Sequence, residues 1–243
     1  MMFEFRETYD SRKKEITDFI ELMHFLQNQE LLKEDGISNF DKFFHSEPEK
    51  INLTYQSLIN ILKSNISLMI YNLIEYTVTN LINCIYDEIR SNNLTYQDVN
   101  HYIRKLWRER ILKAVNDPTA NYNTFIKKNE EIINVILNNI TLDMDSKNGI
   151  PGGNLGGVEI KTTFENHGVR IVTNSPNYRP DILDKVKKQR NNLAHGSVSF
   201  TDALRENTIT DIDRNQQQIT SFLEELIDTV STYIAAQQYK VSP

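Results

Sequence analysis

The chain has few of the residues that interrupt helices or form covalent cross-links. Its 243 residues include one cysteine, eight glycines and six prolines. A single cysteine cannot form an internal disulfide, and Cys84 lies inside an apolar-periodic segment, which indicates a core position and a reducing compartment. So few glycines and prolines favour helices over a strand-rich sandwich. We therefore expect an all-α protein of the cytoplasm.

No segment has the composition of a secretory leader or of a membrane span. Residues 1–7 already carry three charges, and no apolar run with a small-residue cleavage site follows them. The most apolar stretch, 68–86, is too polar to face lipid. Its interrupting residues are Asn72, Glu75, Asn80 and Asn83. The sequence predicts no contact with membranes.

Several chemistries lack the residues that they require. The five histidines are dispersed, and neither His-Glu-x-x-His nor Cys-x-x-Cys occurs. No tight acidic cluster suggests a two-metal nuclease, so we expect neither a metal nor a cofactor. Gly152 and Gly157 have the spacing of a phosphate-binding P-loop, but Val158 stands where that motif needs lysine. The Gly-x-Ser-x-Gly turn of serine hydrolases is missing as well.

Charge is spread unevenly along the chain. The net charge of −6 argues against nonspecific binding to duplexes, yet residues 51–199 alone sum to +3. Two clusters supply this excess, and if they face one groove they can hold a short phosphate backbone. The alternative is that both are ordinary solvated helix faces. The candidate RNA-binding residues are Arg104 and Arg108 in the first cluster and Lys185, Lys187 and Lys188 in the second.

Hydrophobic residues at helical spacing predict a bundle of about six helices. The expected segments are 8–32, 54–90, 95–115, 117–139, one beginning near 180, and one beginning near 210. Their start signals are a Thr95–Asp98 capping box, the pair Asp117-Pro118, Pro180 and a Thr210–Asp213 cap.

Residues 141–178 are only weakly helical. They include a glycine-rich loop at 149–157, and residues 158–172 alternate like a small hairpin. A short helix that ends at Gly168 fits the same residues equally well. We expect a single domain over 1–243, with an irregular or hairpin insertion near 141–178.

One short segment combines groups that suit phosphodiester cleavage. It reads Arg190-Asn191-Asn192-Leu193-Ala194-His195-Gly196. Arginine can grip two phosphate oxygens through its planar fork, and histidine titrates near neutral pH and can move protons. An arginine and a histidine at such a spacing also arise by chance about once in a chain of this length. Other residues and motifs of the chain, which form the context of this pair, must therefore decide whether the pair is functional.

That context resembles the HEPN superfamily, whose helical bundles carry an arginine, four to six residues and a histidine as a metal-independent RNA-cleaving motif. In addition, the stretch Tyr71-Asn72-Leu73-Ile74-Glu75 is similar to the Tyr-Asn-x-Ile-Glu stretch of a bacterial subgroup. The Gly153-Asn154-Leu155 loop and residues 233–239 also resemble that subgroup. Its members are predicted to act in toxin–antitoxin or phage-defence systems.

The resemblance implies an endoribonuclease and a role for each motif residue. RNA is cleaved by its own 2′-hydroxyl, giving a 2′,3′-cyclic phosphate. His195 transfers a proton, and Arg190 stabilises the phosphorane. Asn191 orients His195 or donates to a phosphate oxygen, and Glu75 positions a ring nitrogen. The alternatives are a non-catalytic HEPN-like dimer that binds RNA or protein, and an unrelated helical scaffold.

The spacing of the motif raises a geometric problem. On one straight helix, residues five apart point about 140° away from each other, so Arg190 and His195 do not converge. Either the last turn unwinds at 194–196, or a second copy supplies the missing group. We expect a homodimer with a composite site. Some HEPN toxins are neutralised through modification of a tyrosine two residues after the histidine, but Ser197 stands there, so any antitoxin is expected to act by direct binding or by another mechanism.

Overall fold

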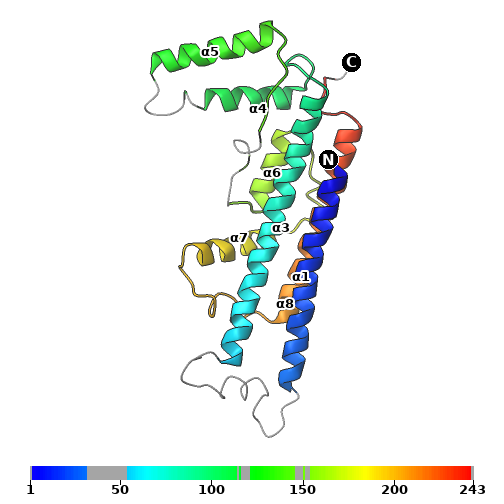
Figure 1. Ribbon diagram of the computed structural model, residues 1–243, viewed down its shortest axis with the longest axis vertical. Coiled ribbons are helices and arrows are strands. Elements are labelled where there is room, and N and C mark those ends of the chain that lie inside the picture. Colours follow the sequence, from blue (N-terminus) through cyan, green and yellow to red (C-terminus); the bar gives the residue numbers. More distant parts are fainter. Residues whose placement is uncertain are drawn as a thin grey trace.

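The computed structural model describes residues 2–31, 54–113, 115, 121–145, 150 and 154–241, and every regular element within them is a helix (Figure 1). The helices are α1 (Met2–Leu31), α3 (Tyr55–Ser91), α4 (His101–Leu112), α5 (Tyr122–Leu137), α6 (Gly157–Asn166), α7 (Pro180–Ala194) and α8 (Ile209–Ala235). The all-α prediction is confirmed, with one helix more than the six expected. No helix in the described ranges combines the length and the apolarity that crossing a membrane demands.

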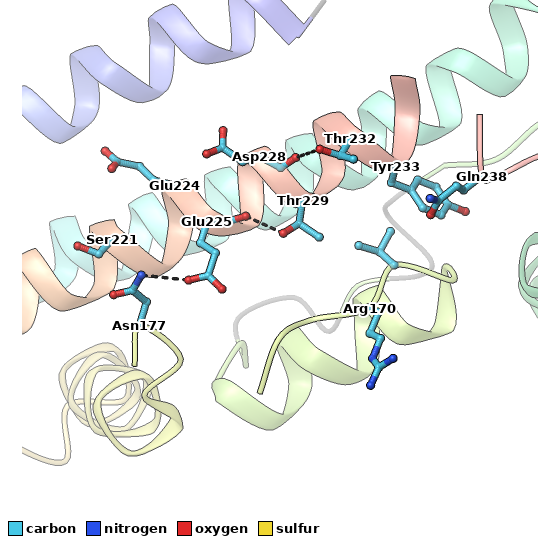
Figure 2. A pocket seen from close by; sticks show the side chains of 11 residues that line it. Arg170, Asn177, Ser221, Glu224, Glu225, Asp228, Thr229, Thr232, Tyr233 and Gln238 are labelled. Atoms are coloured by element: carbon cyan, nitrogen blue, oxygen red, sulfur yellow. Dashed lines mark hydrogen bonds between the residues drawn. The ribbon is translucent and has the colours of Figure 1, made fainter. Parts of the chain in front are cut away.

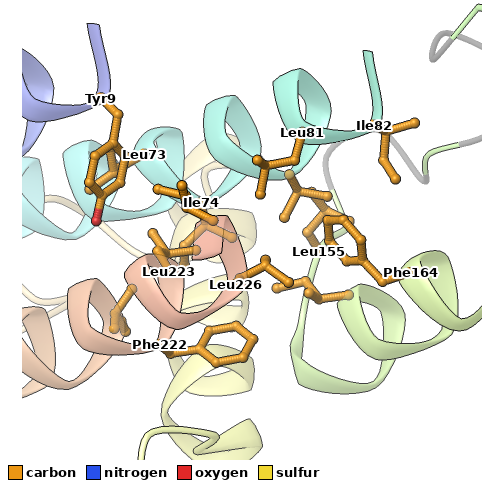
Figure 3. Packing of buried hydrophobic residues seen from close by; sticks show 14 of the residues in the cluster. Tyr9, Leu73, Ile74, Leu81, Ile82, Leu155, Phe164, Phe222, Leu223 and Leu226 are labelled. Carbon is orange, nitrogen blue, oxygen red and sulfur yellow. The ribbon is translucent and has the colours of Figure 1, made fainter. Parts of the chain in front are cut away.

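Three long helices, α1, α3 and α8, form the body of the molecule (Figure 1). Their apolar faces meet in one core, where Leu73 and Ile74 of α3 lie close to Leu223 of α8 and Tyr9 comes in from α1 (Figure 3). Burial of these faces supplies the main stabilisation, at about 25 cal/mol per Å² of apolar surface removed from water. Cys84 is also buried, as predicted.

The start of α8 shows why one capping signal was misplaced. The Thr208 hydroxyl accepts a hydrogen bond from the Asp211 amide, and the Asp211 carboxylate accepts one from the Thr208 amide. The predicted Thr210–Asp213 cap is therefore wrong by two residues. Both pairs have the same spacing, but a start at Thr208 brings Ile209 into the helix, where it is buried.

The start of α4 also lies later than predicted. Thr95 and Asp98 do interact, since the Thr95 amide donates to the Asp98 carboxylate over 2.8 Å, but this bond closes a turn before the helix. The helix begins after Asn100, whose side chain accepts from the Ile103 amide at 3.0 Å. An isolated bridge between Val99 and Lys240 holds the chain out of the helix until that point. The Asp117-Pro118 signal lies outside the described residues.

The region predicted as a hairpin is helix α6. Its start is set by Gly157, and its end by Gly168, which takes φ +81°, so the alternative of a short helix ending at Gly168 is confirmed. The amides of Gly168 and Val169 donate back to carbonyls of the last turn, a common helix ending that needs a left-handed residue. The hairpin is wrong because Ile160 and Phe164, four apart, are both fully buried on one helix face.

Two parts of this fold matter for function. Helices α4 and α5 form an arm that follows the end of α3, whereas α7 packs against α3 nearer to its middle (Figure 1). Pro180 occupies the first turn of α7, as predicted. The part of α3 on which α7 packs positions the candidate site.

Candidate functional site

Three separate sequence motifs meet where α7 packs on α3. The Arg190 guanidinium donates to the Glu75 carboxylate across 3.1 Å and lies over the Tyr71 ring, 4.2 Å from its centroid. Tyr71 and Glu75 are one turn apart on α3, so they share a face. The Leu155 amide reaches the same place and donates to the Tyr71 hydroxyl over 2.9 Å. We call this group of residues, with Asn191, the junction.

Arg190 is fixed in position by these contacts. Its side chain is 19% exposed and that of Glu75 is 30% exposed, so the ion pair lies partly shielded from water. A second N–H of the guanidinium donates to the Asn191 carboxamide at 3.0 Å. Two directional bonds and a flat aromatic support orient the fork of the guanidinium. Asn191 therefore holds Arg190, whereas the sequence suggested that it orients His195 or a phosphate.

Tyr71 supports the junction in its protonated form. Burial raises the pKa of Tyr71, and the Glu75 carboxylate adds to that rise, while the Leu155 amide and the Arg190 charge act against it. A phenol with a raised pKa stays neutral near pH 7 and is a poor base. Tyr71 thus joins the 154–156 segment to α3 and supports Arg190 without titrating.

His195 lies at the exposed end of α7. Its own amide still donates to the Asn191 carbonyl over 3.0 Å, so the helical pattern extends through His195. Gly196 then takes φ +67°, and the amides of Gly196 and Ser197 close the helix end. Unwinding therefore begins only after His195, and in the described part of one chain no contact joins Arg190 to His195. Unwinding of the last turn thus does not bring the pair together within one chain, and convergence through a second copy stays a prediction.

The structure places Glu75 against Arg190, and its role in positioning a ring nitrogen stays a prediction. The resemblance implied that it positions a ring nitrogen, whereas its carboxylate lies against Arg190. This placement follows from the packing of α7 across α3, which is also seen in a hydrogen bond from Ser67 to Gln189 over 3.1 Å. The pairing matters chemically because a substrate phosphate can compete with Glu75 for the same guanidinium.

The basic residues of α7 divide into two kinds. Lys187 is 18% exposed and bonds both oxygens of Glu159 at 3.0 Å, with Asp184 at 3.6 Å. Burial acts to raise the pKa of Glu159, but the Lys187 hydrogen bond, the Lys187 charge and backbone amide bonds together outweigh it, so the pKa is lowered. Lys187 therefore fastens α6 to α7. Lys185 and Lys188 are exposed on the surface of α7.

The two predicted basic clusters do not line one groove. Glu75 and Ser91, the last residue of α3, are separated by about 24 Å of helix, and α4 lies beyond that end. Within the arm, Arg104 donates to the carbonyls of Tyr96 and Gln97, each over 2.8 Å. Arg108 is exposed. The cluster on α4 is thus placed apart from the junction.

A groove that the sequence did not indicate opens beside Glu75. It has a volume of about 460 Å³, and its walls include Arg12, Asn72, Glu75, Tyr76, Asn80 and Leu155. The Arg12 guanidinium lies 4.1 Å from the centroid of the Tyr76 ring. Sequence reasoning missed Arg12 because it belongs to the first 50 residues, whose net charge is negative, although it opens the short basic run Arg12-Lys13-Lys14. Only the packing of α1 on α3 brings it to the site.

A larger groove, of about 760 Å³, runs along α8 and has the wrong charge for RNA. Figure 2 shows Glu224, Glu225 and Asp228 along its helical wall. Glu225 accepts hydrogen bonds from Ser175 and Asn177, and Glu224 pairs with Lys13 of α1. The three carboxylates repel a phosphate backbone, and those of Glu224 and Glu225 already have structural partners. The candidate site is therefore the junction with its adjoining groove.

Comparison with protein-family models gives one match. The model described as HEPN_MAE_28990-like HEPN matches residues 3–239. Comparisons with curated proteins and with solved structures found no match. The matched range contains every residue of the junction as well as Arg12 and His195.

Proposed function

The chain belongs to the HEPN_MAE_28990-like HEPN family, and on that basis we propose that it is a metal-independent endoribonuclease. One observation carries the proposal, namely that Arg190 lies over the Tyr71 ring and is hydrogen-bonded to both Glu75 and Asn191. A guanidinium oriented in advance on a partly exposed surface suits the stabilisation of charge that develops on a phosphate. The helical fold and the family supply the context that the Arg–His spacing alone lacks.

In the proposed reaction the RNA supplies its own nucleophile. The 2′-oxygen attacks the adjacent phosphorus while the bond to the 5′-oxygen breaks. A neutral His195 imidazole takes the 2′-hydroxyl proton, or a protonated one donates to the leaving 5′-oxygen. Arg190 donates to the non-bridging oxygens of the phosphorane. The products are a 2′,3′-cyclic phosphate and a 5′-hydroxyl, and DNA is not cleaved because it lacks the nucleophile.

The active site is composite and forms between two copies of the chain. Within one chain, His195 ends α7 on the exposed side while Arg190 turns toward α3. A twofold dimer places His195 of one protomer opposite Arg190 of the other and creates two equal sites. The exposed residues from Ala194 to Ser197 leave the end of α7 open for this contact.

The proposed cellular role is that of a toxin or phage-defence effector. Expression of the wild type is then poorly tolerated by cells, whereas expression of His195→Ala is tolerated. A protein antitoxin would act by binding, because Ser197 replaces the tyrosine that a modifying partner needs.

The decisive experiment is cleavage of a labelled single-stranded RNA in EDTA, with analysis of the product ends. Wild type is compared with Arg190→Ala and His195→Ala, and the matched controls are Arg214→Ala and His101→Ala, which change exposed residues away from the junction. The proposal expects cyclic-phosphate ends from the wild type and both controls only. Equal cleavage by all five proteins, or none by the wild type, would favour a binding module.

The composite site has its own test. Arg190→Ala and His195→Ala proteins are mixed, dissociated and allowed to reassociate. A mixed dimer contains one doubly damaged site and one intact site, so random mixing restores about a quarter of the wild-type activity. Recovery of no activity from two inactive but dimeric variants would show that each chain builds its own site.

A further inference from the structure

The groove beside Glu75 contains a cation with no acidic partner. Among the residues that the structure describes, Arg12 has no ion pair, although its neighbours Arg6, Lys13 and Lys14 on α1 each pair with a carboxylate. Instead the Arg12 guanidinium is stacked on Tyr76, whose ring is itself stacked on Phe5 at 5.9 Å. A stacked arginine keeps the edges of its fork free to donate hydrogen bonds.

Arg12 and Arg190 each lie over a tyrosine ring of α3 and each lie near Glu75, Arg190 through an ion pair and Arg12 across the groove that Glu75 lines. Arg190 lies 4.2 Å from the centroid of Tyr71, and Arg12 lies 4.1 Å from that of Tyr76. The two tyrosines are five residues apart on α3, so they differ by about 7.5 Å along the helix axis and by about 140° around it. The two arginines therefore approach Glu75 from different helices, α1 and α7.

The wall of the groove beside Arg12 is polar and suits a nucleotide. Asn72 is exposed there, and its carboxamide can both donate and accept. Asn80 commits its amide to the Tyr76 carbonyl over 2.8 Å, which leaves its carbonyl oxygen as an acceptor. The negative charge of Glu75 is balanced by Arg190, so the groove does not repel an anion as the groove along α8 does.

We infer that this groove is a second phosphate subsite, in which Arg12 binds a backbone phosphate of single-stranded RNA next to the phosphate held by Arg190. The inference rests on the proposed function for the identity of its ligand. Arg12 is assigned to binding and positioning of the strand, not to the chemical step. The groove thereby sets the direction in which the RNA crosses the junction.

The test measures binding without cleavage. The full chain is titrated into a fluorescent single-stranded RNA whose 2′-hydroxyls are methylated, so that it cannot be cut, and the titration is repeated at several salt concentrations. Arg12→Ala is expected to weaken binding about tenfold and to reduce the salt slope by about one, as loss of one phosphate contact does. Tyr76→Leu, which removes the stacking platform, is expected to weaken binding about threefold.

Arg6→Ala is the matched control. Arg6 lies on the same helix and also faces a tyrosine ring, with 5.6 Å between its guanidinium carbon and the Tyr9 centroid, but it pairs with Asp10 and does not line the groove. Its binding and salt slope are expected to equal those of the wild type. Thermal unfolding of each variant confirms that a loss of binding is not a loss of fold.

The outcomes separate this inference from the ribonuclease proposal. If Arg12→Ala and Arg6→Ala bind alike while the wild type cleaves RNA, the subsite is wrong and the enzyme stands. If the wild type never cleaves but Arg12→Ala alone binds weakly, the subsite stands and the ribonuclease is wrong. If the wild type binds no methylated RNA, the subsite is overturned, whatever the cleavage assay gives.

Discussion

The arm and the junction use arginine in different ways, although both belong to basic runs in the sequence. In the arm, Arg104 bonds the carbonyls of Tyr96 and Gln97, and Arg110 bonds that of Asp143. At the junction, Arg190 bonds side chains only, namely Glu75 and Asn191. A guanidinium that satisfies backbone carbonyls holds a turn in place, and moving it leaves those carbonyls unpaired. A guanidinium that is paired with side chains can exchange one of these side chains for a phosphate oxygen.

The sharpest test of this contrast is removal of the junction arginine. Arg190→Ala is expected to reduce RNA cleavage by about 10²- to 10³-fold, the usual cost of losing a donor to a developing negative charge. The free energy of unfolding should change little by comparison, because the Arg190–Glu75 pair is partly exposed. Cleavage rates and denaturant unfolding curves measure the two effects. If Arg190→Ala instead lowers the free energy of unfolding strongly but keeps the cleavage rate per folded molecule, Arg190 is a structural residue and not a catalytic one.

A fall in pH should destabilise the fold near the arm before it affects the junction. His167 is fully buried at the end of α6, where its Nδ1 donates to the Thr163 carbonyl over 2.7 Å and its Nε2 accepts from the Tyr86 hydroxyl over 2.5 Å. Burial lowers the pKa of His167 to about 4, so the folded protein keeps this ring neutral. The unfolded chain, with an ordinary pKa near 6.5, binds a proton more readily as the pH falls.

Stability from His167 is therefore complete above about pH 6.5 and is lost as the pH falls toward about 4. The expected loss is about 2 kcal/mol between pH 7 and pH 5, measured by denaturant unfolding at closely spaced pH values. His195→Ala should show the same loss as the wild type, because His195 is exposed. An unfolding free energy that stays flat over this range would contradict the prediction.

Removal of an arm arginine should lower stability and leave RNA cleavage nearly unchanged, which is the reverse of the result expected for Arg190→Ala. Arg104→Ala is expected to lower the free energy of unfolding by about 1 to 2 kcal/mol, because two backbone carbonyls lose charge-assisted hydrogen bonds. RNA cleavage per folded molecule should stay within about twofold of wild type, since a change of one hydrogen-bond donor far from the reaction leaves the barrier nearly intact. A large loss of cleavage with normal stability would instead place the arm in the RNA-binding surface.

The smallest expected effect comes from a single hydroxyl at the junction. Tyr71→Phe keeps the ring under Arg190 but removes the acceptor of the Leu155 amide. It should cost about 1 kcal/mol of unfolding free energy, because that amide is left buried and unpaired, and it should reduce cleavage only a few-fold. Tyr76→Phe is the stability control. Amide hydrogen exchange at Leu155 should increase in Tyr71→Phe and stay unchanged in Tyr76→Phe.

The sequence predicted the fold class and the motif helices well because their signals are local. Hydrophobic spacing places α3 and α8, and Pro180 marks the start of α7. The misplaced caps have a different cause, since Thr208 and Thr210 carry equivalent local signals and only the burial of Ile209 decides between them. Local pattern also left 158–172 open between helix and hairpin, and the core contacts of Phe164 settle it.

The site was harder to predict because its contacts join distant parts of the chain. Glu75 was chosen from a motif, but its partner Arg190 follows only from the packing of α7 on α3. Lys187 appeared to be a free cation, and Glu159, 28 residues away, neutralises it. Arg12 was missed because the sequence of α1 does not show which of its basic residues pair with carboxylates, as Lys13 and Lys14 do, and which lie over the Tyr76 ring of α3.

The junction also limits when activity can appear during synthesis of the chain. Its tyrosine and carboxylate come from α3 and its loop amide from Leu155, but its arginine follows Glu75 by 115 residues. A growing chain therefore exposes the tyrosine–carboxylate face of α3 long before the cation that completes it has been made. If the finished protein cuts RNA, the ribosome and the message that produce it meet a competent active site only after Arg190 and His195 have been made.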